Sequence, residues 1–284
     1  MTTSIYHKAI LTGTIPSNEG NKRPFPVSLQ GAVYSSDGEL VFNSLRRCSY
    51  AGVKHVADSY IHPQRIEIAG HIDEHCRYIG HYHAHFGHFL IETLPELVIG
   101  AKTGKKIVAH SFMNQANALI SSFSQEVLSL LQLKNKDIVL IKKKNLLCKS
   151  LEVSLRVTSV NSSISPTARE AYQYISGLVK ESSVLHEKIY LSRSKVLKRP
   201  SPAEVDQLMK SRGYYIYHPQ EHSLIDQISL IKGAKEIAGY DGSALHLSVF
   251  MKPMGKISVL DERKNRNTEM INQLMEHHTE VIKI

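Results

Sequence analysis

Short apolar segments alternate with helix-forming segments along residues 188–284, and the connections between them are short. Strands are expected at 188–191, 214–217, 236–239, 256–260 and 281–284, with helices at 202–211, 223–232 and 244–250 and a last helix before the final strand. Strands separated in this way by helices are joined by crossover connections, which makes their sheet parallel. This part of the chain is therefore expected to form a doubly wound α/β domain.

The first half of the chain has the same alternation over a shorter stretch. An apolar segment at 105–110 precedes a helical pattern at 115–131, and a second apolar segment follows at 137–141. Strand, helix and strand with short connections predict a further parallel sheet with covering helices.

A change of composition separates the two halves. Residues 161–166 are polar and end in a proline, which favours a link between domains. We therefore divide the chain into residues 1–163 and residues 164–284.

Four of the 16 histidines fall between positions 81 and 88. His81, His83 and His85 alternate, which places them on one side of an extended chain. The glycine before His88 permits a change of direction. From His88 onward leucines recur at helical spacing, so His88 and Glu92 share a helix face. The segment predicts a strand, a turn and a helix with titratable groups converging at the turn.

The net charge of +9 at pH 7 favours an anionic partner. A nucleotide, a phosphorylated lipid or an acidic membrane surface would fit this charge. A basic nucleic-acid-binding module would fit it as well, but the chain contains no recognisable nucleic-acid-reading motif. No nucleic-acid partner is therefore expected.

The three cysteines, Cys48, Cys76 and Cys148, are widely spaced and odd in number. This pattern argues against a disulfide framework and a zinc ribbon, and it is typical of a reducing compartment. The sequence has no signal-peptide hydrophobic region and no run of about 18 apolar residues. A cytoplasmic protein is expected, with peripheral contact at the inner face of an anionic membrane.

Two segments follow predicted strands at the carboxyl edge of the second sheet, where ligands bind in such folds. Arg193 and Arg199 belong to a loop with four cations in seven positions, and they can clamp a pyrophosphate. In the other segment, Gly242, Ser243 and Ala244 open a short helix and would offer free backbone N–H groups. Together the segments predict phosphate binding, although neither a dinucleotide fingerprint nor a P-loop is present.

Five short motifs follow one another between about residues 80 and 255. They are Phe86-Gly87-His88-Phe89-Leu90-Ile91-Glu92-Thr93-Leu94-Pro95, Tyr190-Leu191-Ser192-Arg193, Lys198-Arg199, Asp226-Gln227 and Ala238-Gly239-Tyr240-Asp241-Gly242-Ser243-Ala244-Leu245. In this order and spacing they resemble the signatures of glycosyltransferase family 61.

The resemblance implies an α/β, GT-B-like architecture of two Rossmann-like lobes with the active site in the cleft between them. Residues 1–163 would form the acceptor-side lobe and residues 164–284 the nucleotide-sugar-binding lobe. The implied reaction is an inverting, metal-independent transfer from a nucleotide sugar, such as a UDP-sugar, to a glycan or glycolipid acceptor, with no cofactor. Bacterial relatives are linked with the synthesis of capsule or other surface polysaccharides.

The resemblance implies donor binding at seven positions: Arg193, Lys198, Arg199, Glu221, Gly242, Ser243 and Ala244. The diphosphate would lie on Arg193 and on the turn at 242–244. Lys198 replaces the first of two arginines usual in the family, and Glu221 falls near an acidic position that would bind the nucleoside.

Two residues depart from the family pattern. Asp241 stands where a histidine is usual, and Glu96 stands where an arginine is usual. A carboxylate about 4 Å from a phosphate charge would cost on the order of 4 kcal/mol at an effective dielectric constant near 20. Asp241 is therefore expected to turn away, to accept a hydrogen bond from a sugar or ribose hydroxyl, or to pair with Arg193 or a histidine. We retain it as a candidate catalytic base.

An inverting transfer needs a base for the acceptor hydroxyl and cations for the departing diphosphate. We predict His88 as this base and Glu92 as the carboxylate that orients it, with His85 as the alternative base. The competing interpretation is that His88 and Glu92 only stabilise the turn.

A metal site is the main alternative from another functional class. His81, His83 and His85 could hold zinc or another transition metal together with Glu92. A metal-binding protein or metalloenzyme that uses the cluster from His81 to His88 with Glu92 is therefore the alternative function. The predicted helix from His88 disfavours a cupin fold for such a site.

Overall fold

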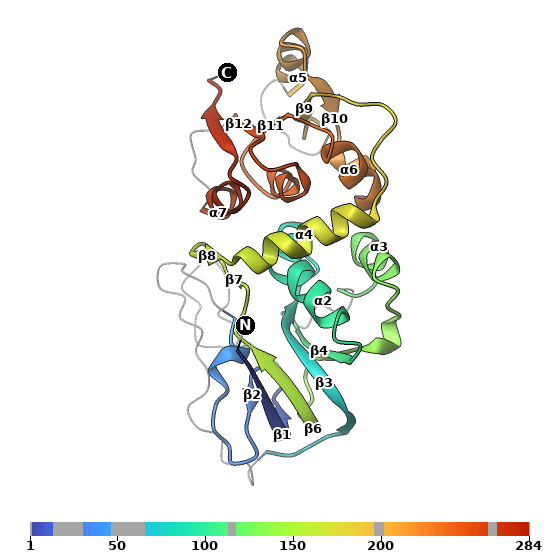
Figure 1. Cartoon of the computed structure of the whole chain (residues 1–284), viewed down its shortest axis with the longest axis vertical. Helices are drawn as coiled ribbons and strands as arrows, with labels where there is room; N and C mark the ends of the chain where they lie inside the picture. The colour runs from blue at the N-terminus through green and yellow to red at the C-terminus, as the bar shows by residue number, and fades with distance from the viewer. Residues whose placement is uncertain are drawn as a thin grey trace. The chain divides into compact units, whose positions relative to one another are not determined.

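The computed structural model describes residues 2–13, 31–46, 66–112, 118–195, 202–260 and 266–283. The chain divides into two compact units, Met1–Val160 and Asn161–Ile284. Strands and helices occur in both units, so the protein is a mixed α/β protein (Figure 1).

The first unit contains a six-stranded sheet of mixed direction. Its strands are β1 (Thr3–Leu11), β2 (Val33–Tyr34), β3 (His71–Tyr82), β4 (Lys106–Ser111), β5 (Ile138–Ile141) and β6 (Leu146–Ser154), and the two-residue strand β7 (Thr158–Ser159) lies outside this sheet. The order is β2-β1-β6-β3-β4-β5. The parallel pairing of β4 with β5 confirms the parallel sheet predicted for this region.

Strand β1 makes the first unit differ from a wholly parallel Rossmann-like sheet. It runs antiparallel to both of its neighbours, β2 and β6, whereas β6, β3, β4 and β5 are mutually parallel. The apolar core of this sheet includes Cys76 and Cys148, which are buried free thiols. Cys48 lies outside the described residues.

A continuous helical segment follows β3 and carries the centre of the candidate site. It consists of α1 (Phe86–His88), the π-helix η3 (Phe89–Thr93) and α2 (Leu94–Ala101). The helix that we predict from His88 therefore starts at Phe86. Every residue of η3 is buried, which indicates a helix enclosed by its unit rather than one with a solvent face. π-helical turns are rare and frequently occur at functional sites.

The predicted extended run of histidines is shorter in the structure. Strand β3 ends at Tyr82, so His81 belongs to the strand while His83 and His85 lie in the loop before α1. Just before His81, Gly80 has a φ of 78°, a conformation that favours glycine.

The arginine packed on this glycine adds a second constraint. A Cβ atom at Gly80 would overlap the guanidinium of Arg156. Gly80 therefore permits both the bend before the histidines and the burial of Arg156 beside β3.

The remaining helices in the described part of the first unit are short. They are the 3₁₀ turns η1 (Phe42–Ser44) and η5 (Asn135–Asp137) and the α-helix α3 (Ser122–Leu130). The helix predicted over 115–131 begins only at Ser122, because Ser121 has extended backbone and forms its N-cap. Residues 113–117 lie outside the described residues.

The second unit contains a five-stranded, wholly parallel sheet. Its strands are β9 (Lys188–Leu191), β10 (Tyr215–Tyr217), β11 (Glu236–Gly239), β12 (Lys256–Val259) and β13 (His278–Val281), and β8 (Ser163–Ile164) precedes them. In the order β10-β9-β11-β12-β13, the chain adds β10 on one side of β9 and then adds β11, β12 and β13 on the other side. This is a doubly wound order, and the order of strand addition reverses between β9 and β11. Ligands of such sheets bind beyond the carboxyl ends of the strands at this reversal.

The helices of the second unit follow the predicted alternation. They are α4 (Pro166–Leu178), α5 (Pro202–Ser211), α6 (Leu224–Ile231) and α7 (Arg266–Met275), with the 3₁₀ segments η6 (Pro219–Glu221) and η7 (Leu245–Phe250). The predicted helix at 244–250 is thus a 3₁₀ helix. No helix in the part of the chain that the structure describes is both long and apolar enough to cross a bilayer.

The last predicted strand is misplaced by several residues. We expected residues 281–284, but β13 is His278–Val281, with His278 paired to Lys256 and Val281 to Val259. Strand β13 lies at the edge of the sheet and all of its residues are exposed. The apolar pattern that predicts buried strands is therefore absent from it.

Candidate active site

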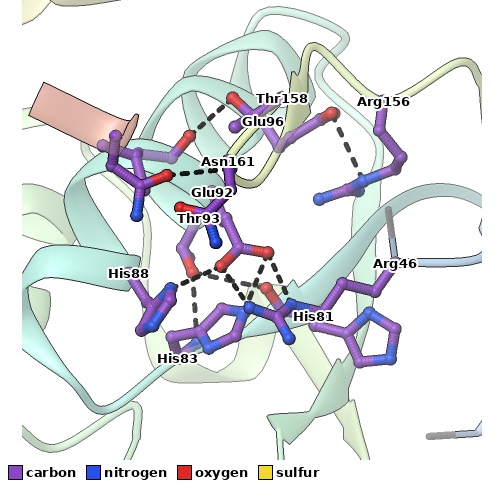
Figure 2. Close-up of polar contacts among 12 residues, drawn as sticks. Arg46, His81, His83, His88, Glu92, Thr93, Glu96, Arg156, Thr158 and Asn161 are labelled. Atoms are coloured by element: carbon purple, nitrogen blue, oxygen red, sulfur yellow. Dashed lines mark hydrogen bonds and ion pairs between the residues drawn. The ribbon is translucent and has the colours of Figure 1, made fainter. Parts of the chain in front are cut away.

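Glu92 is a buried carboxylate of η3 toward which Arg46, His83 and His88 converge (Figure 2). Its Oε1 is 2.7 Å from Nδ1 of His88. Arg46 donates through Nε to Oε2 at 2.7 Å and through Nη2 to Oε1 at 2.8 Å. Nε2 of His83 lies 3.5 Å from Oε2. The hydrogen bond between His88 and Glu92 that the sequence spacing predicts is confirmed.

The charges of this cluster are strongly coupled. Burial raises the pKa of Glu92, but His83 and Arg46 outweigh it, so the pKa lies well below its ordinary value. Burial lowers the pKa of His83 to about 4, although Glu92 acts in the opposite direction. Near neutral pH the cluster therefore contains a carboxylate, a guanidinium and an uncharged His83.

The ionised carboxylate decides which nitrogen of His88 carries the proton. A carboxylate only accepts hydrogen bonds, so Nδ1 of His88 must donate to Oε1. The other nitrogen, Nε2, then retains its lone pair in the neutral ring. The His88 side chain is 29% exposed, in contrast to 5% for Glu92. This geometry presents an oriented, accessible acceptor for a proton.

Aromatic rings lie beside His88 and its partner Glu92. The ring of His83 is 5.4 Å from that of His88 and 4.3 Å from that of Phe112. His85 is exposed and its ring lies 5.3 Å from that of His88. His85 therefore remains next to the predicted base as the alternative.

Arg46 is the residue of this cluster that the sequence did not indicate. It precedes Glu92 by 46 positions, in a region without a recognisable motif. Its guanidinium lies 4.8 Å from the ring centroid of Phe112, which adds a cation–π contact. Only the fold brings Arg46 to the carboxylate.

The second unit brings together the two segments that we predict to bind phosphate. Strands β9 and β11 are parallel neighbours, and Leu191 at the end of β9 is opposite Gly239 at the end of β11. Arg193 and Gly242 follow these two ends. The position that a Cβ would take at Gly242 is 3.9 Å from Nη1 of Arg193. The shared edge that we predict for the two segments is confirmed.

The turn after β11 leaves backbone donors available. Gly242 has a φ of 147°, which favours glycine. Within the described part of the chain, the backbone N–H groups of Gly242, Ser243 and Ala244 make no hydrogen bond, whereas the carbonyl of Gly242 accepts from the N–H of Leu245. A guanidinium and unpaired N–H groups thus lie at the switch point of a doubly wound sheet, the arrangement that favours a phosphate.

Comparison with protein families agrees with this geometry, since the family model for glycosyltransferase 61 matches residues 86–258. The chain belongs to the glycosyltransferase 61 family. It is therefore a glycosyltransferase, and the matched segment includes His88, Glu92, Arg193 and Gly242 but begins after Arg46. A comparison with curated proteins finds no match.

Asp241, one of the two residues predicted to depart from the glycosyltransferase 61 pattern, is hydrogen-bonded to helix α7. Its Oδ1 accepts a hydrogen bond from Oγ1 of Thr268 at 2.7 Å. Thr268 is buried, so this contact ties one carboxylate oxygen of Asp241 to the helix. The role of Asp241 as a base stays a prediction.

Glu96, the other departure, is buried against a cation. It accepts a hydrogen bond from the backbone N–H of Val157 at 2.9 Å, and Nε of Arg156 lies 3.5 Å from the same oxygen. Glu96 and Arg156 thus form a buried pair of opposite charges.

Glu221 is held at the surface by a lysine of the basic loop. Nζ of Lys195 donates to both oxygens of Glu221, at 2.6 and 2.8 Å, and this hydrogen bonding lowers the pKa of Glu221. Gln227 of α6 supports the same segment by donating to the carbonyl groups of Pro219 and His222. Nucleoside binding by Glu221 stays a prediction.

The other two predicted donor-binding cations, Lys198 and Arg199, lie outside the described residues.

The alternative metal site finds no support in the described residues. Among them, no group of three or more histidine, cysteine, aspartate or glutamate side chains is arranged to hold a metal ion. Glu92, the predicted carboxylate ligand, already has Arg46 and His88 on its oxygens. A guanidinium paired with both oxygens would also repel a cation there.

Proposed function

We propose that this glycosyltransferase moves a sugar from a nucleotide sugar to a hydroxyl group of a glycan or glycolipid acceptor, with inversion and without a metal ion. The observation that most supports the proposal is the His88–Glu92 pair, in which Nε2 of His88 is left as a proton acceptor. The Arg193–Gly242 turn supports a diphosphate leaving group.

In the proposed reaction, the acceptor hydroxyl attacks the anomeric carbon from the face opposite the leaving group. The bond from the anomeric carbon to the diphosphate oxygen breaks, and the configuration inverts. Nε2 of His88 takes the hydroxyl proton, and Glu92 stabilises the resulting imidazolium through Nδ1–H. Arg193 and the N–H groups at 242–244 stabilise the negative charge on the departing nucleoside diphosphate.

The proposal includes the GT-B architecture that the family resemblance implies. A UDP-sugar as donor and a role in capsule or other surface polysaccharide synthesis belong to the same proposal. The net charge of +9 supports peripheral contact with an anionic membrane that carries a glycolipid acceptor.

Binding of a nucleoside diphosphate should stabilise the protein against heat. A ligand at 100 times its Kd adds about 2.7 kcal/mol. About 1 kcal/mol shifts the Tm of a domain of 150–250 residues by roughly 2–4 °C. Thermal melting should be measured with UDP, ADP, GDP and CDP, each with and without EDTA. We expect a rise in Tm that differs between the four nucleobases and persists in the presence of EDTA.

Arg193→Ala should abolish this shift because it removes the cation at the switch point. The matched control is Arg169→Ala, which removes an arginine of α4 whose Nη1 lies 2.7 Å from Glu276 and should leave the shift intact. Absence of any shift in the unchanged protein across the four nucleotides would contradict the proposal. A shift that disappears with EDTA would contradict its metal independence.

A further inference from the structure

Arg46 makes two hydrogen bonds to Glu92, and it lies outside the segment that matches the family. Its Nε and Nη2 reach the two different oxygens of the carboxylate, at 2.7 and 2.8 Å, which is the bidentate geometry of a strong guanidinium–carboxylate pair. Oε1 accepts from both Arg46 and His88. The orientation of one carboxylate therefore links the arginine to the predicted base.

The terminal torsion of a glutamate is broad, so a single hydrogen bond does not fix the plane of its carboxylate. The two contacts from Arg46 fix this plane. Arg46 is itself held, because its side chain is only 15% exposed and its guanidinium lies 4.8 Å from the ring centroid of Phe112. Phe112 also contacts the His83 ring, so one aromatic side chain supports two of the three neighbours of Glu92.

We propose that Arg46 is a positioning residue for the glycosyl transfer, which fixes the Glu92 carboxylate so that Oε1 holds Nδ1–H of His88 and Nε2 remains free to take the acceptor proton. This inference rests on the proposed function, because it assigns a role to Arg46 through the base of that reaction.

Arg46 also balances the charge of the cluster. The titratable groups facing His88 are Glu92, His83 and His85, and Arg46 is the cation that faces Glu92. Arg46 is one of the groups that lower the pKa of His83, so without Arg46 His83 would be protonated at higher pH. A protonated His83 would compete with His88 for the Glu92 carboxylate, so the acid limb of the activity profile should move to higher pH.

The test compares Arg46→Ala, Arg46→Lys and the control Arg169→Ala. In metal sites, loss of a residue that orients a ligating side chain typically lowers activity roughly 10–100-fold, and we expect a comparable loss for a residue that orients the partner of a base. We expect Arg46→Ala to lower kcat by this factor, to leave the KM for the donor unchanged and to shift the acid limb of kcat/KM to higher pH. Arg46→Lys keeps the charge without the planar fork, so an intermediate loss is expected. Added guanidinium ion should restore part of kcat in Arg46→Ala and should not affect Arg169→Ala.

A second readout does not depend on activity. In ¹⁵N NMR of the full chain, His88 should be the Nδ1–H tautomer in the unchanged protein and a mixture of tautomers in Arg46→Ala. Arg46 is one of the groups that lower the pKa of His83, which is about 4. His83 should therefore titrate at higher pH in Arg46→Ala.

Unchanged kcat, pH profile and tautomer in Arg46→Ala would overturn the inference. If Arg46→Ala does not fold, Arg46→Lys becomes the test of the inference. A wild-type kcat and a wild-type His88 tautomer in Arg46→Lys would then overturn the inference. If the unchanged protein transfers no sugar, the proposed function fails, while the His88 tautomer still tests whether Arg46 positions the pair.

Discussion

His88→Ala is expected to lower kcat by about 10²–10⁴-fold, the usual contribution of a general base. The donor should bind as before, because the cations that we assign to the diphosphate lie on the second unit. The measurement is steady-state kinetics with a nucleotide sugar and its acceptor, together with the melting shift caused by the nucleoside diphosphate. Loss of kcat with an intact shift would separate catalysis from donor binding.

Two further histidines give this experiment its controls. His186→Ala removes a ring that stacks on Tyr215 at 3.8 Å in the second unit, and it should retain activity. His85→Ala tests the alternative base. If His85→Ala loses kcat and His88→Ala retains it, the assignment of the base to His88 is wrong.

Glu96→Ala is expected to lower the free energy of unfolding by about 3–5 kcal/mol, the range for removing one partner of a buried ion pair. The Arg156 side chain is only 7% exposed and would keep a charge without its carboxylate. Its Nη1 is buried and has no hydrogen-bond partner among the described residues. Urea unfolding measured by circular dichroism gives the change in free energy.

The double variant Glu96→Leu with Arg156→Leu is the matched control. Replacing both charged side chains by apolar ones should lower the free energy of unfolding much less than Glu96→Ala does, because neither charge is then left buried without its partner. A loss below about 1 kcal/mol in Glu96→Ala, the range of an exposed pair, would contradict the structural role that we assign to Glu96.

The parallel sheet of the second unit could be predicted from the sequence because its signals are local. Strands β9, β11 and β12 are mostly buried apolar runs, and each is followed by a helix. The placement of Arg193 and Gly242 at one edge follows from the parallel direction of β9 and β11. The prediction for edge strand β13 (His278–Val281) is wrong by three residues, because all of its residues are exposed and form no apolar run that marks the strand.

The parts of the site that the sequence did not reveal depend on contacts between distant segments. Arg46 and Glu92 are 46 positions apart, and Val157 and Glu96 are 61 apart, so neither pair produces a periodic pattern. The spacing of His88 and Glu92 is a local helical relation and was predicted correctly. The π-helix at Phe89–Thr93 could not be predicted, because its residues are also typical of an ordinary α-helix.

The most direct test of the account is the configuration of the transferred sugar. The protein, in the presence of EDTA, should be supplied with a panel of nucleotide sugars and oligosaccharide acceptors, and the anomeric signal of each product should be followed by ¹H NMR from the first turnovers. We predict that an α-linked donor gives a β-linked product, and that His88→Ala gives almost none. A product with retained configuration, or no transfer from any donor in the panel, would contradict the account.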